Sequence, residues 1–335
     1  MGDVAMIVPV LRAFSTQHPL VKITVVSRPF FKPFFDTIPN VTFFSIDVTN
    51  RHKGFTGIIR LFKDLKKLQV THIADLHNVL RSKIIRFLFA PCDIKIAATN
   101  KGRAEKKQLT RLQKKDIAPL KSMIARHVDT FSSLGFSVDL NNPQFPIKAP
   151  ISSEILNKLN ETSHFFAHQL IGIAPFAQYT TKVYPFDLMQ QLINELLKNG
   201  HQKIILFGGG KNEINLLNQL QNNNKTTLVV AGKLSLTEEL QLISNLDLML
   251  SMDSANAHLA AMLGIKVVTL WGATHPFAGF VPFNQPLQNC LVANRERYPF
   301  LPTSVYGNKF VPGYEDAMRT IKVTQIIEKI NSLLE

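Results

Sequence analysis

The sequence contains little cysteine and no long apolar run. Its two cysteines, Cys92 and Cys290, lie far apart and lack the spacing of a metal site. Two isolated thiols suit a reducing cytosol and argue against a zinc site or a disulfide framework. No apolar run approaches the roughly 18–20 residues that a membrane span needs. Because the N-terminus also lacks the basic region and cleavage site of a signal peptide, we expect a cytoplasmic protein.

Acidic residues are scarce in the first half of the chain. Residues 1–150 contain 24 Lys and Arg against 10 Asp and Glu, a net charge of +14, whereas residues 151–335 contain 14 of each. This excess indicates that the N-terminal half meets a negative partner, such as nucleic acid, an anionic lipid surface or a phosphorylated acceptor. A solvated basic face without any specific partner explains the charge equally well.

The hydrophobic pattern alternates short β-branched runs with longer helical periods, which is typical of doubly wound parallel sheets. In the first half we expect strands over residues 21–27, 41–45, 70–76 and 93–98, and helices over 4–17, 55–68 and 79–89. In the second half we expect strands over 170–174, 203–207, 226–230, 248–251 and 266–270, a loop-rich stretch over 273–312 and a last helix over 323–333. At 335 residues the chain is long enough for two such domains.

The link between the two domains is marked by three prolines, Pro143, Pro146 and Pro150. We therefore expect domains over residues 1–150 and 151–335. The chain runs from Gly2-Asp3 directly into a helix, whereas a doubly wound domain opens with a central strand before that turn. The first strand of the N-terminal domain is accordingly expected to be missing.

Two segments of the second half place polar side chains directly after predicted strands, at the edge where open α/β sheets bind ligands. Residues 251–259 (SMDSANAHL) open a helix whose first N–H groups and positive dipole end can hold a phosphate, with Ser254 adding a hydroxyl. Residues 174–182 end in Lys182, whose charge can neutralise a pyrophosphate leaving group. Each also has a plain structural interpretation, as a helix cap or an ordinary surface lysine.

Two further positions complete this prediction. Gly208, Gly209 and Gly210 let the backbone approach a ligand closely, and Glu213 can accept hydrogen bonds from a ribose. Asp3, the only acidic residue among the first eleven, is either a helix cap or a general base. Together these loops predict a nucleotide-diphosphate pocket with an aspartate opposite, which suits group transfer.

The combination of motifs resembles glycosyltransferase family 9, the ADP-heptose:lipopolysaccharide heptosyltransferases. The resemblance covers nearly the whole chain. Its motifs are residues 251–259 followed by 266–274 (KVVTLWGAT), Gly2-Asp3-Val4 followed by residues 9–12 (PVLR), Lys182 before Tyr184-Pro185, and residues 232–236 (GKLSL).

The resemblance implies an α/β, GT-B fold, with two facing Rossmann-like domains and a cleft between them. The N-terminal domain would bind the acceptor and the C-terminal domain, with its terminal helix, the nucleotide-sugar donor. The implied activity is inverting transfer of heptose from ADP-heptose to the lipopolysaccharide inner core, with no metal and no cofactor. The acceptor would be an anionic glycolipid, so we expect peripheral contact with the inner face of the inner membrane and no nucleic-acid partner.

Site residues are carried over by matching position. Asp3 would be the base that deprotonates the acceptor hydroxyl, and Lys182 would stabilise the ADP leaving group. The remaining donor-binding positions are Gln178, Glu213 on ribose, Leu234 on adenine, Asp253, Ser254, Ala255, Asn256 and His258. Acceptor contacts are expected from the basic residues Arg12, Arg81 and Lys83, for each of which an exposed helix position is the alternative.

Ala255 departs from the family pattern, which often has glycine there. This change is mild only if the backbone keeps a negative φ at Ala255. Three other functions stay open: a GT-B relative with another nucleotide-sugar donor or a nucleotide-sugar epimerase, a catalytically silent member, and a non-catalytic basic binding protein.

Overall fold

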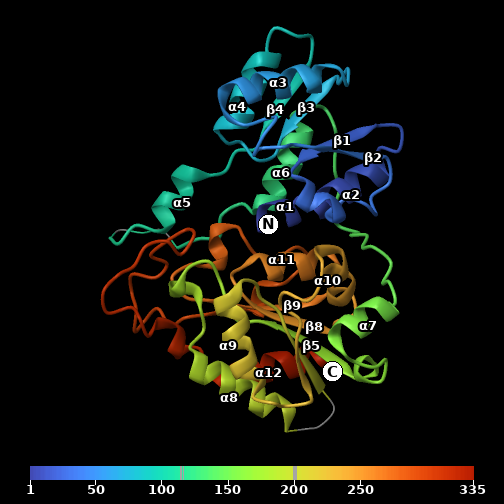
Figure 1. The fold of residues 1–335 in the computed structure, drawn as a ribbon. Coiled ribbons are helices and arrows are strands. Elements are labelled where there is room, and N and C mark those ends of the chain that lie inside the picture. The colour runs from blue at the N-terminus through green and yellow to red at the C-terminus, as the bar shows by residue number, and fades with distance from the viewer. Residues whose placement is uncertain (114, 116, 199–201) are drawn as a thin grey trace. The chain divides into compact units, whose positions relative to one another are not determined.

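The computed structural model describes residues 1–113, 115, 117–198 and 202–335 (Figure 1). The chain divides into two compact units. Unit 1 comprises residues 1, 3–102 and 121–144, and unit 2 comprises residues 2, 103–120 and 145–335. Among the described residues, none of the helices is both long enough and apolar enough to cross a membrane.

Unit 1 is built from short strands alternating with helices. Its elements are α1 (Gly2–Ala5), α2 (Val8–Gln17), β1 (Ile23–Ser27), the 3-10 turn η1 (Pro29–Phe34), β2 (Val41–Ser45), α3 (Gly54–Lys66), β3 (His72–Asp75), α4 (Leu80–Phe89), β4 (Lys95–Ala98) and α6 (Met123–Ser132). All four predicted strands and the helices at 55–68 and 79–89 are confirmed. The sequence did not lead us to expect α6, which begins after Ser122, whose hydroxyl accepts from the Ala125 N–H at 3.0 Å.

Two expectations for unit 1 are corrected. The helix expected over residues 4–17 is two helices, because Pro9 has no N–H to continue the hydrogen-bond ladder across it. The four strands form two separate parallel pairs in place of one doubly wound sheet. Ile23 lies opposite Val41 in the β1–β2 pair, and His72 lies opposite Lys95 in the β3–β4 pair. Most residues of these strands are only half-buried.

Helices α3 and α4 lie side by side in unit 1 (Figure 1). Their inner faces meet in a small apolar cluster, which holds Ile58, Leu61, Leu65, Ile85 and Phe89. Half-buried apolar residues of the strands pack against this cluster, including Phe44, Ile73 and Ile96. The opposite faces of the two helices are left to solvent.

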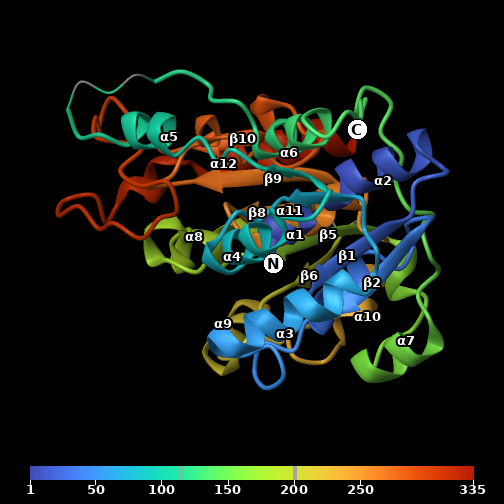
Figure 2. The same cartoon turned by 90° about the horizontal axis from the view of Figure 1, so that it is seen from above.

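Unit 2 contains a six-stranded parallel sheet in the order β10-β9-β8-β5-β6-β7, most of which can be followed in Figure 2. Its strands are β5 (Gln169–Ala174), β6 (Gln202–Leu206), β7 (Thr227–Val229), β8 (Leu248–Met252), β9 (Lys266–Trp271) and β10 (Cys290–Val292). The five predicted strands are confirmed. β10 is an addition, because it lies in the stretch expected to be loop-rich.

The helices of unit 2 are α5 (Arg103–Leu109), α7 (Ser153–Leu159), α8 (Phe186–Leu197), α9 (Lys211–Gln221), α10 (Leu236–Ile243), α11 (Ala255–Met262) and α12 (Val323–Leu334). Of these, α8, α9, α11 and α12 pack against strands of the sheet. The core is nearly free of solvent: Ile171, Leu250 and Val268 from the strands pack with Leu192 of α8 and Ile326 of α12. The central strands of this sheet are buried, in contrast to the half-buried strands of unit 1, and they give the loops at the carboxyl edge a rigid base.

Candidate functional site

The strand order of unit 2 identifies where a ligand binds. The chain builds outward from β5 in both directions, through β6 and β7 on one side and β8, β9 and β10 on the other. Ligands of open α/β sheets bind at such a switch point, beyond the carboxyl ends of the strands. The loops that follow β5 and β8 therefore form the centre of the site, and they contain Lys182 and Asp253.

Lys182 lies in the 3-10 turn η3 (Thr180–Lys182) and is 9% exposed. Its ammonium group donates to the main-chain carbonyl of Asp253 at 2.5 Å and lies 3.2 Å from the Asp253 Oδ2. The Thr274 hydroxyl donates to the same Oδ2 at 2.9 Å. An ammonium has three N–H donors. Two of the Lys182 donors have partners among the described residues, so the third can bind a ligand.

The aliphatic stem of Lys182 is held by a glycine far along the chain. A Cβ at Gly307 would lie 2.7 Å from Cγ and 2.8 Å from Cδ of Lys182, and Gly307 has a φ of +86°. The neighbouring Thr181 hydroxyl donates to the Gly307 carbonyl at 2.5 Å. The loop after β10 thus fixes the direction of the lysine. No role was expected for Thr274 or Gly307, since neither contact is visible before the chain folds.

Helix α11 begins directly after this ion pair. Ser254 occupies the cap position, but its hydroxyl bonds to the Ser251 hydroxyl at 3.0 Å and does not cap the helix. The first N–H groups of a helix have no partner within it, so the start of α11 can hold an anion. Ala255 and Asn256 are half-buried in this first turn, and Ala255 keeps a helical, negative φ. The replacement of glycine by Ala255 is therefore accommodated.

The other predicted donor residues lie on or near neighbouring loops of the same sheet edge. Glu213, in the first turn of α9, accepts from the Gly209 N–H at 2.8 Å and so braces the glycine turn after β6. Leu234 is half-buried in the loop after β7, and Gln178 is exposed in the loop after β5. His258 is 7% exposed within α11. The fold of unit 2 thus brings all predicted donor positions to one edge of one sheet, with His258 one turn into α11.

A second titratable side chain lies directly after Thr274. His275 is 7% exposed, and its Nδ1 accepts from the Phe277 N–H at 3.2 Å. Burial, followed by the charges of Arg295 and Lys115, lowers the pKa of His275 to about 4. The imidazole is therefore neutral at pH 7 and serves as a cap for the turn η4 (Pro276–Ala278).

The residues predicted in unit 1 are dispersed. Asp3 is exposed in α1, Arg81 is half-buried and Lys83 is exposed on α4. Arg12 is 7% exposed, and its guanidinium donates to the Thr37 carbonyl at 3.1 Å and hydroxyl at 2.7 Å. Arg12 thus makes a structural contact within unit 1, and its charged group is buried.

His77, a residue that the sequence did not single out, lies within electrostatic reach of Asp3. Burial and then the charge of Lys101 lower the pKa of His77, and the charges of Asp3 and Asp75 act in the opposite direction. His77 follows β3, where the Asp75 carboxylate accepts from the His77 N–H at 3.2 Å. In the part of the chain that the structure describes, no three His, Cys, Asp or Glu side chains converge to hold a metal ion.

Comparison with known proteins identifies the family. The model of "Glycosyltransferase family 9 (heptosyltransferase)" matches residues 58–309. Lipooligosaccharide heptosyltransferase 2 of Haemophilus influenzae is 26% identical, and the match covers 100% of this chain and 96% of that protein.

Two solved structures show the same fold. The E. coli ADP-heptose lps heptosyltransferase II superposes with a TM-score of 0.68 at 19% identity, over 99% of this chain and 95% of that chain. The E. coli heptosyltransferase WaaC with ADP gives a TM-score of 0.66 at 17% identity, over 99% and 96% of the two chains. The fold is therefore that of the GT-B heptosyltransferases, as the resemblance implied.

Proposed function

The chain belongs to glycosyltransferase family 9 and is a heptosyltransferase, and from this premise we propose that it transfers heptose from ADP-heptose to the inner core of lipopolysaccharide. We further propose that the transfer inverts the anomeric centre and needs no metal ion. The observation that carries this proposal is the meeting of Lys182, Asp253 and the start of α11 at the switch point of the unit 2 sheet.

This arrangement suits the diphosphate of a nucleotide sugar. The start of α11 offers uncapped N–H groups and the positive end of a helix dipole, and Lys182 supplies a full positive charge beside it. When the bond from heptose to phosphate breaks, negative charge grows on the leaving ADP. Fixed donors aimed at that charge stabilise the transition state more than the ground state. They do here what a divalent cation does in other transferases, which supports metal-independent transfer.

An inverting displacement needs one base on the acceptor side. Asp3 is exposed in α1, at the start of the basic unit that we assign to the acceptor. In the proposed step its carboxylate takes the proton from the acceptor hydroxyl while the oxygen attacks the anomeric carbon and ADP leaves from the opposite face. Glu213 would bind the ribose, Leu234 the adenine, and Gln178, Asn256 and His258 the rest of the donor.

The acceptor side is proposed to contact the inner face of the inner membrane. Exposed Arg60 and Lys63 of α3 and Lys67, which caps its C-terminal end, follow one another at helical spacing. On α4, exposed Leu80, Lys83 and Phe87 form a similar row, with Leu80 75% and Phe87 77% exposed. Basic and large apolar side chains on one surface are typical of proteins that bind anionic bilayers. This α3–α4 face supports a cytoplasmic enzyme that works at the membrane surface.

Calorimetric titration with ADP, UDP and GDP tests the donor side. We expect the protein to prefer ADP, and Lys182→Ala to weaken ADP binding by roughly 10-fold or more, as loss of a charged hydrogen bond does. Lys225→Ala, which removes an exposed lysine from the loop before β7, is the matched control and should bind as wild type. A preference for UDP or GDP would favour another transferase or an epimerase, and failure to bind any nucleotide would overturn the donor site.

Lys182 is also the partner of a buried carboxylate, so its removal is expected to destabilise unit 2. Breaking a buried ion pair typically costs about 3–5 kcal/mol. Thermal denaturation of each variant therefore accompanies the titration, and Lys182→Arg serves as the variant that keeps the charge. Weak binding by a Lys182→Ala protein that is still folded at the assay temperature is the informative result.

A further inference from the structure

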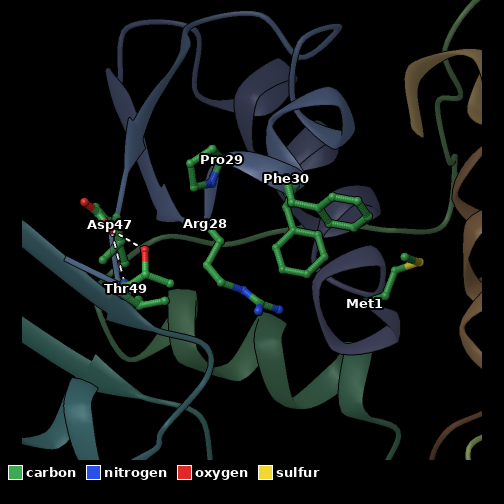
Figure 3. A pocket seen from close by; sticks show the side chains of 9 residues that line it. Met1, Arg28, Pro29, Phe30, Asp47 and Thr49 are labelled. Atoms are coloured by element: carbon green, nitrogen blue, oxygen red, sulfur yellow. Dashed lines mark hydrogen bonds between the residues drawn. The ribbon is translucent and has the colours of Figure 1, made fainter. Parts of the chain in front are cut away.

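A cavity in unit 1 lies in the part of the chain that we assign to the acceptor. It has a volume of about 590 Å³ and is lined by Met1 and by residues 28–31 and 46–49. Figure 3 shows its acidic residue, Asp47, bonded to Thr49 of the same wall, whose hydroxyl donates to the Asp47 Oδ1 at 2.9 Å. We assign no separate function to this cavity, and the feature that the proposed function leaves unused lies in unit 2.

That feature is a segment of unit 2 that comes from the middle of unit 1 in the sequence. Residues 103–113, 115 and 117–120, which we call the strap, follow β4 and precede α6, yet they pack with unit 2. The strap begins with α5, which lies beside the loops that follow β9 and β10 (Figure 1). Connections within compact domains have a median length of about 4–6 residues. A detour of this length therefore needs contacts that hold it on unit 2.

Lys115 joins the strap to the loop after β10. Its ammonium donates to the main-chain carbonyls of Phe300 at 2.5 Å and Pro302 at 3.0 Å. Burial, followed by the charge of Arg295, lowers the pKa of Lys115 to about 8, so the ammonium is still charged at pH 7. Hydrogen bonds from a charged donor are stronger than those between neutral groups, and these two bonds fasten the strap to the loop.

Lys106 joins α5 to the loop after β9. It is 3% exposed, and its ammonium lies 4.1 Å from the centroid of the Phe280 ring, which is a cation–π contact. A buried ammonium needs such contacts, because it has lost its hydration. At the end of the strap, the Leu120 N–H donates to the Phe277 carbonyl at 2.9 Å. Described residues near the start and at the end of the strap thus dock on the same loop.

The loop after β10 connects the strap to the proposed leaving-group lysine. The two carbonyls that accept from the strap are followed directly by Thr303 and Ser304, whose N–H groups donate to the Ala273 carbonyl at 2.9 Å and 3.1 Å. The Ser304 hydroxyl accepts from the Gly307 N–H at 2.9 Å. Gly307 in turn lies against the stem of Lys182. The bonds of the strap therefore bear on the part of the loop that orients this lysine.

The loop after β9 makes a second connection. Phe277 and Phe280, which contact the strap, follow Thr274 within this loop. The Thr274 hydroxyl donates to the Asp253 carboxylate at 2.9 Å, and the same carboxylate oxygen lies 3.2 Å from the Lys182 ammonium. Two series of contacting residues therefore run from the strap to Lys182, one along each loop.

We propose that Lys106 and Lys115 are positioning residues for the donor: they dock the strap on both loops, and the docked strap holds Lys182 in the direction that the donor diphosphate requires. The proposal rests on the proposed function for the identity of the ligand, and it adds two lysines outside the donor loops to donor binding. With the strap undocked, Gly307 and Thr274 can shift and carry the Lys182 ammonium with them. A displacement of about 1 Å is enough to cost a reacting group much of its effect.

Calorimetric titration with ADP measures the effect of each lysine. Lys115→Ala should weaken ADP binding about 5-fold to 30-fold, as for a residue that acts on a binding site through others. Lys115→Arg keeps the charge and the donors and should restore most of the affinity. Lys106→Met, which keeps the apolar stem, should also weaken binding, and Lys106→Arg should restore the cation over the Phe280 ring. Lys107→Ala, at an exposed neighbour on α5, is the matched control.

Double-mutant cycles separate positioning from general stability. Gly307→Ala disturbs the Lys182 stem by itself, so adding Lys115→Ala should weaken ADP binding little further. Thr274→Val is the corresponding background for Lys106→Met, because it removes the hydroxyl bonded to Asp253. Thermal denaturation shows that each variant is folded at the temperature of titration. An equal fold-loss for each lysine variant in wild-type and altered backgrounds would overturn the proposal, as would wild-type ADP affinity in Lys115→Ala and Lys106→Met.

Hydrogen exchange of the nucleotide-free protein tests the docking without any ligand. Lys115→Ala should speed the exchange of N–H groups in residues 300–307 and leave α9 (Lys211–Gln221) at the wild-type rate. Unchanged exchange over 300–307 would overturn the proposal. Faster exchange there, together with a wild type that binds no nucleotide, would support the docking of the strap and count against the proposed function alone.

Discussion

At the scale of single residues, Asp3 and Lys182 are assigned to opposite ends of the proposed displacement. In that proposal Asp3 acts on the acceptor proton and Lys182 on the charge of the leaving group, so substitutions at the two residues should have different kinetic effects. A base contributes to the chemical step, whereas a phosphate-binding cation contributes to donor binding as well. This division gives each residue its own experimental signature.

Asp3→Asn is expected to lower kcat by roughly 10²–10⁴-fold, the range typical of a general base. Affinity for ADP should stay at the wild-type value, because Asp3 makes no donor contact in this account. Steady-state kinetics with calorimetry of the same preparations provides the measurement. Asp36→Asn, which neutralises another exposed carboxylate of unit 1, is the control. A wild-type kcat in Asp3→Asn would show that Asp3 is not the general base.

His275 predicts a specific pH dependence of stability. Its pKa is about 4 in the folded protein and 6.5 when exposed, so between these values the unfolded chain binds the proton and the folded chain does not. Stability contributed by neutral His275 is therefore complete above pH 6.5 and declines as the pH falls. By linkage the decline is about 2 kcal/mol between pH 7 and pH 5.

His275→Asn should remove this part of the pH dependence, because asparagine keeps an acceptor for the Phe277 N–H and does not titrate. Urea unfolding at pH 7 and pH 5 compares the two proteins. If both lose the same free energy of unfolding between these pH values, His275 is not the group responsible.

Residue roles divided into those the sequence predicts and those only the fold reveals. Lys182 and Asp253 follow strands in the sequence, so their meeting at a sheet edge was predictable. Thr274 and Gly307 became visible only through contacts across 21 and 125 residues of chain. Arg12 shows the converse: it was expected to contact the acceptor, with an exposed helix position as the alternative, and its bonds to Thr37 could not be read from local sequence.

At the scale of elements, the hydrophobic periodicity of the sequence predicted the strands more accurately than it predicted the ends of the helices. The buried strands of unit 2 are continuous apolar runs, as expected for parallel strands covered on both faces. Hydrophobic spacing alone predicted one continuous helix over residues 4–17, which is interrupted at Pro9. The separation of the unit 1 strands into two pairs accords with the expectation of a missing first strand, because that strand lies between the second and the fourth in a doubly wound sheet.

The loop that carries Gly307 contacts the stem of Lys182, so a substitution at Gly307 tests whether this loop positions the proposed leaving-group lysine. Gly307→Ala introduces a left-handed residue, costing about 1–2 kcal/mol, and a Cβ that overlaps the Lys182 stem. We expect lower stability and weaker ADP binding. Gly313→Ala has a similar φ of +82° but no atom within 4 Å of the added Cβ, so it should lose stability and keep ADP affinity. Identical ADP affinities in Gly307→Ala and Gly313→Ala would contradict the role of Gly307 in positioning Lys182.

At the scale of the whole molecule, charge is concentrated where the acceptor is proposed to bind. Residues 1–150 carry the entire net charge of +14, and the α3–α4 face adds exposed Leu80 and Phe87 to exposed lysines. Each basic residue near an anionic bilayer contributes on the order of 1 kcal/mol, and salt screens this contribution.

Sedimentation with vesicles checks the membrane surface. We expect binding to vesicles that contain anionic lipid, weaker binding at high salt, and little binding to zwitterionic vesicles. Replacing Leu80 and Phe87 together by Glu should reduce binding roughly 10-fold or more, through lost apolar burial and added like charge. Leu20→Glu, at a residue 96% exposed elsewhere in unit 1, should have a smaller effect. An equal loss of vesicle binding in the Leu80 and Phe87 double variant and in Leu20→Glu would mean that net charge alone governs binding.

The central claim is tested most directly by incubating the protein with ADP-heptose and heptose-deficient lipopolysaccharide, in the presence of a metal chelator, and weighing the product by mass spectrometry. The account predicts that the core gains one heptosyl unit with wild-type protein, that NMR spectroscopy of the product shows the inverted configuration at the new linkage, and that Asp3→Asn forms far less product. An unchanged acceptor, with protein that is folded and binds ADP, would contradict it.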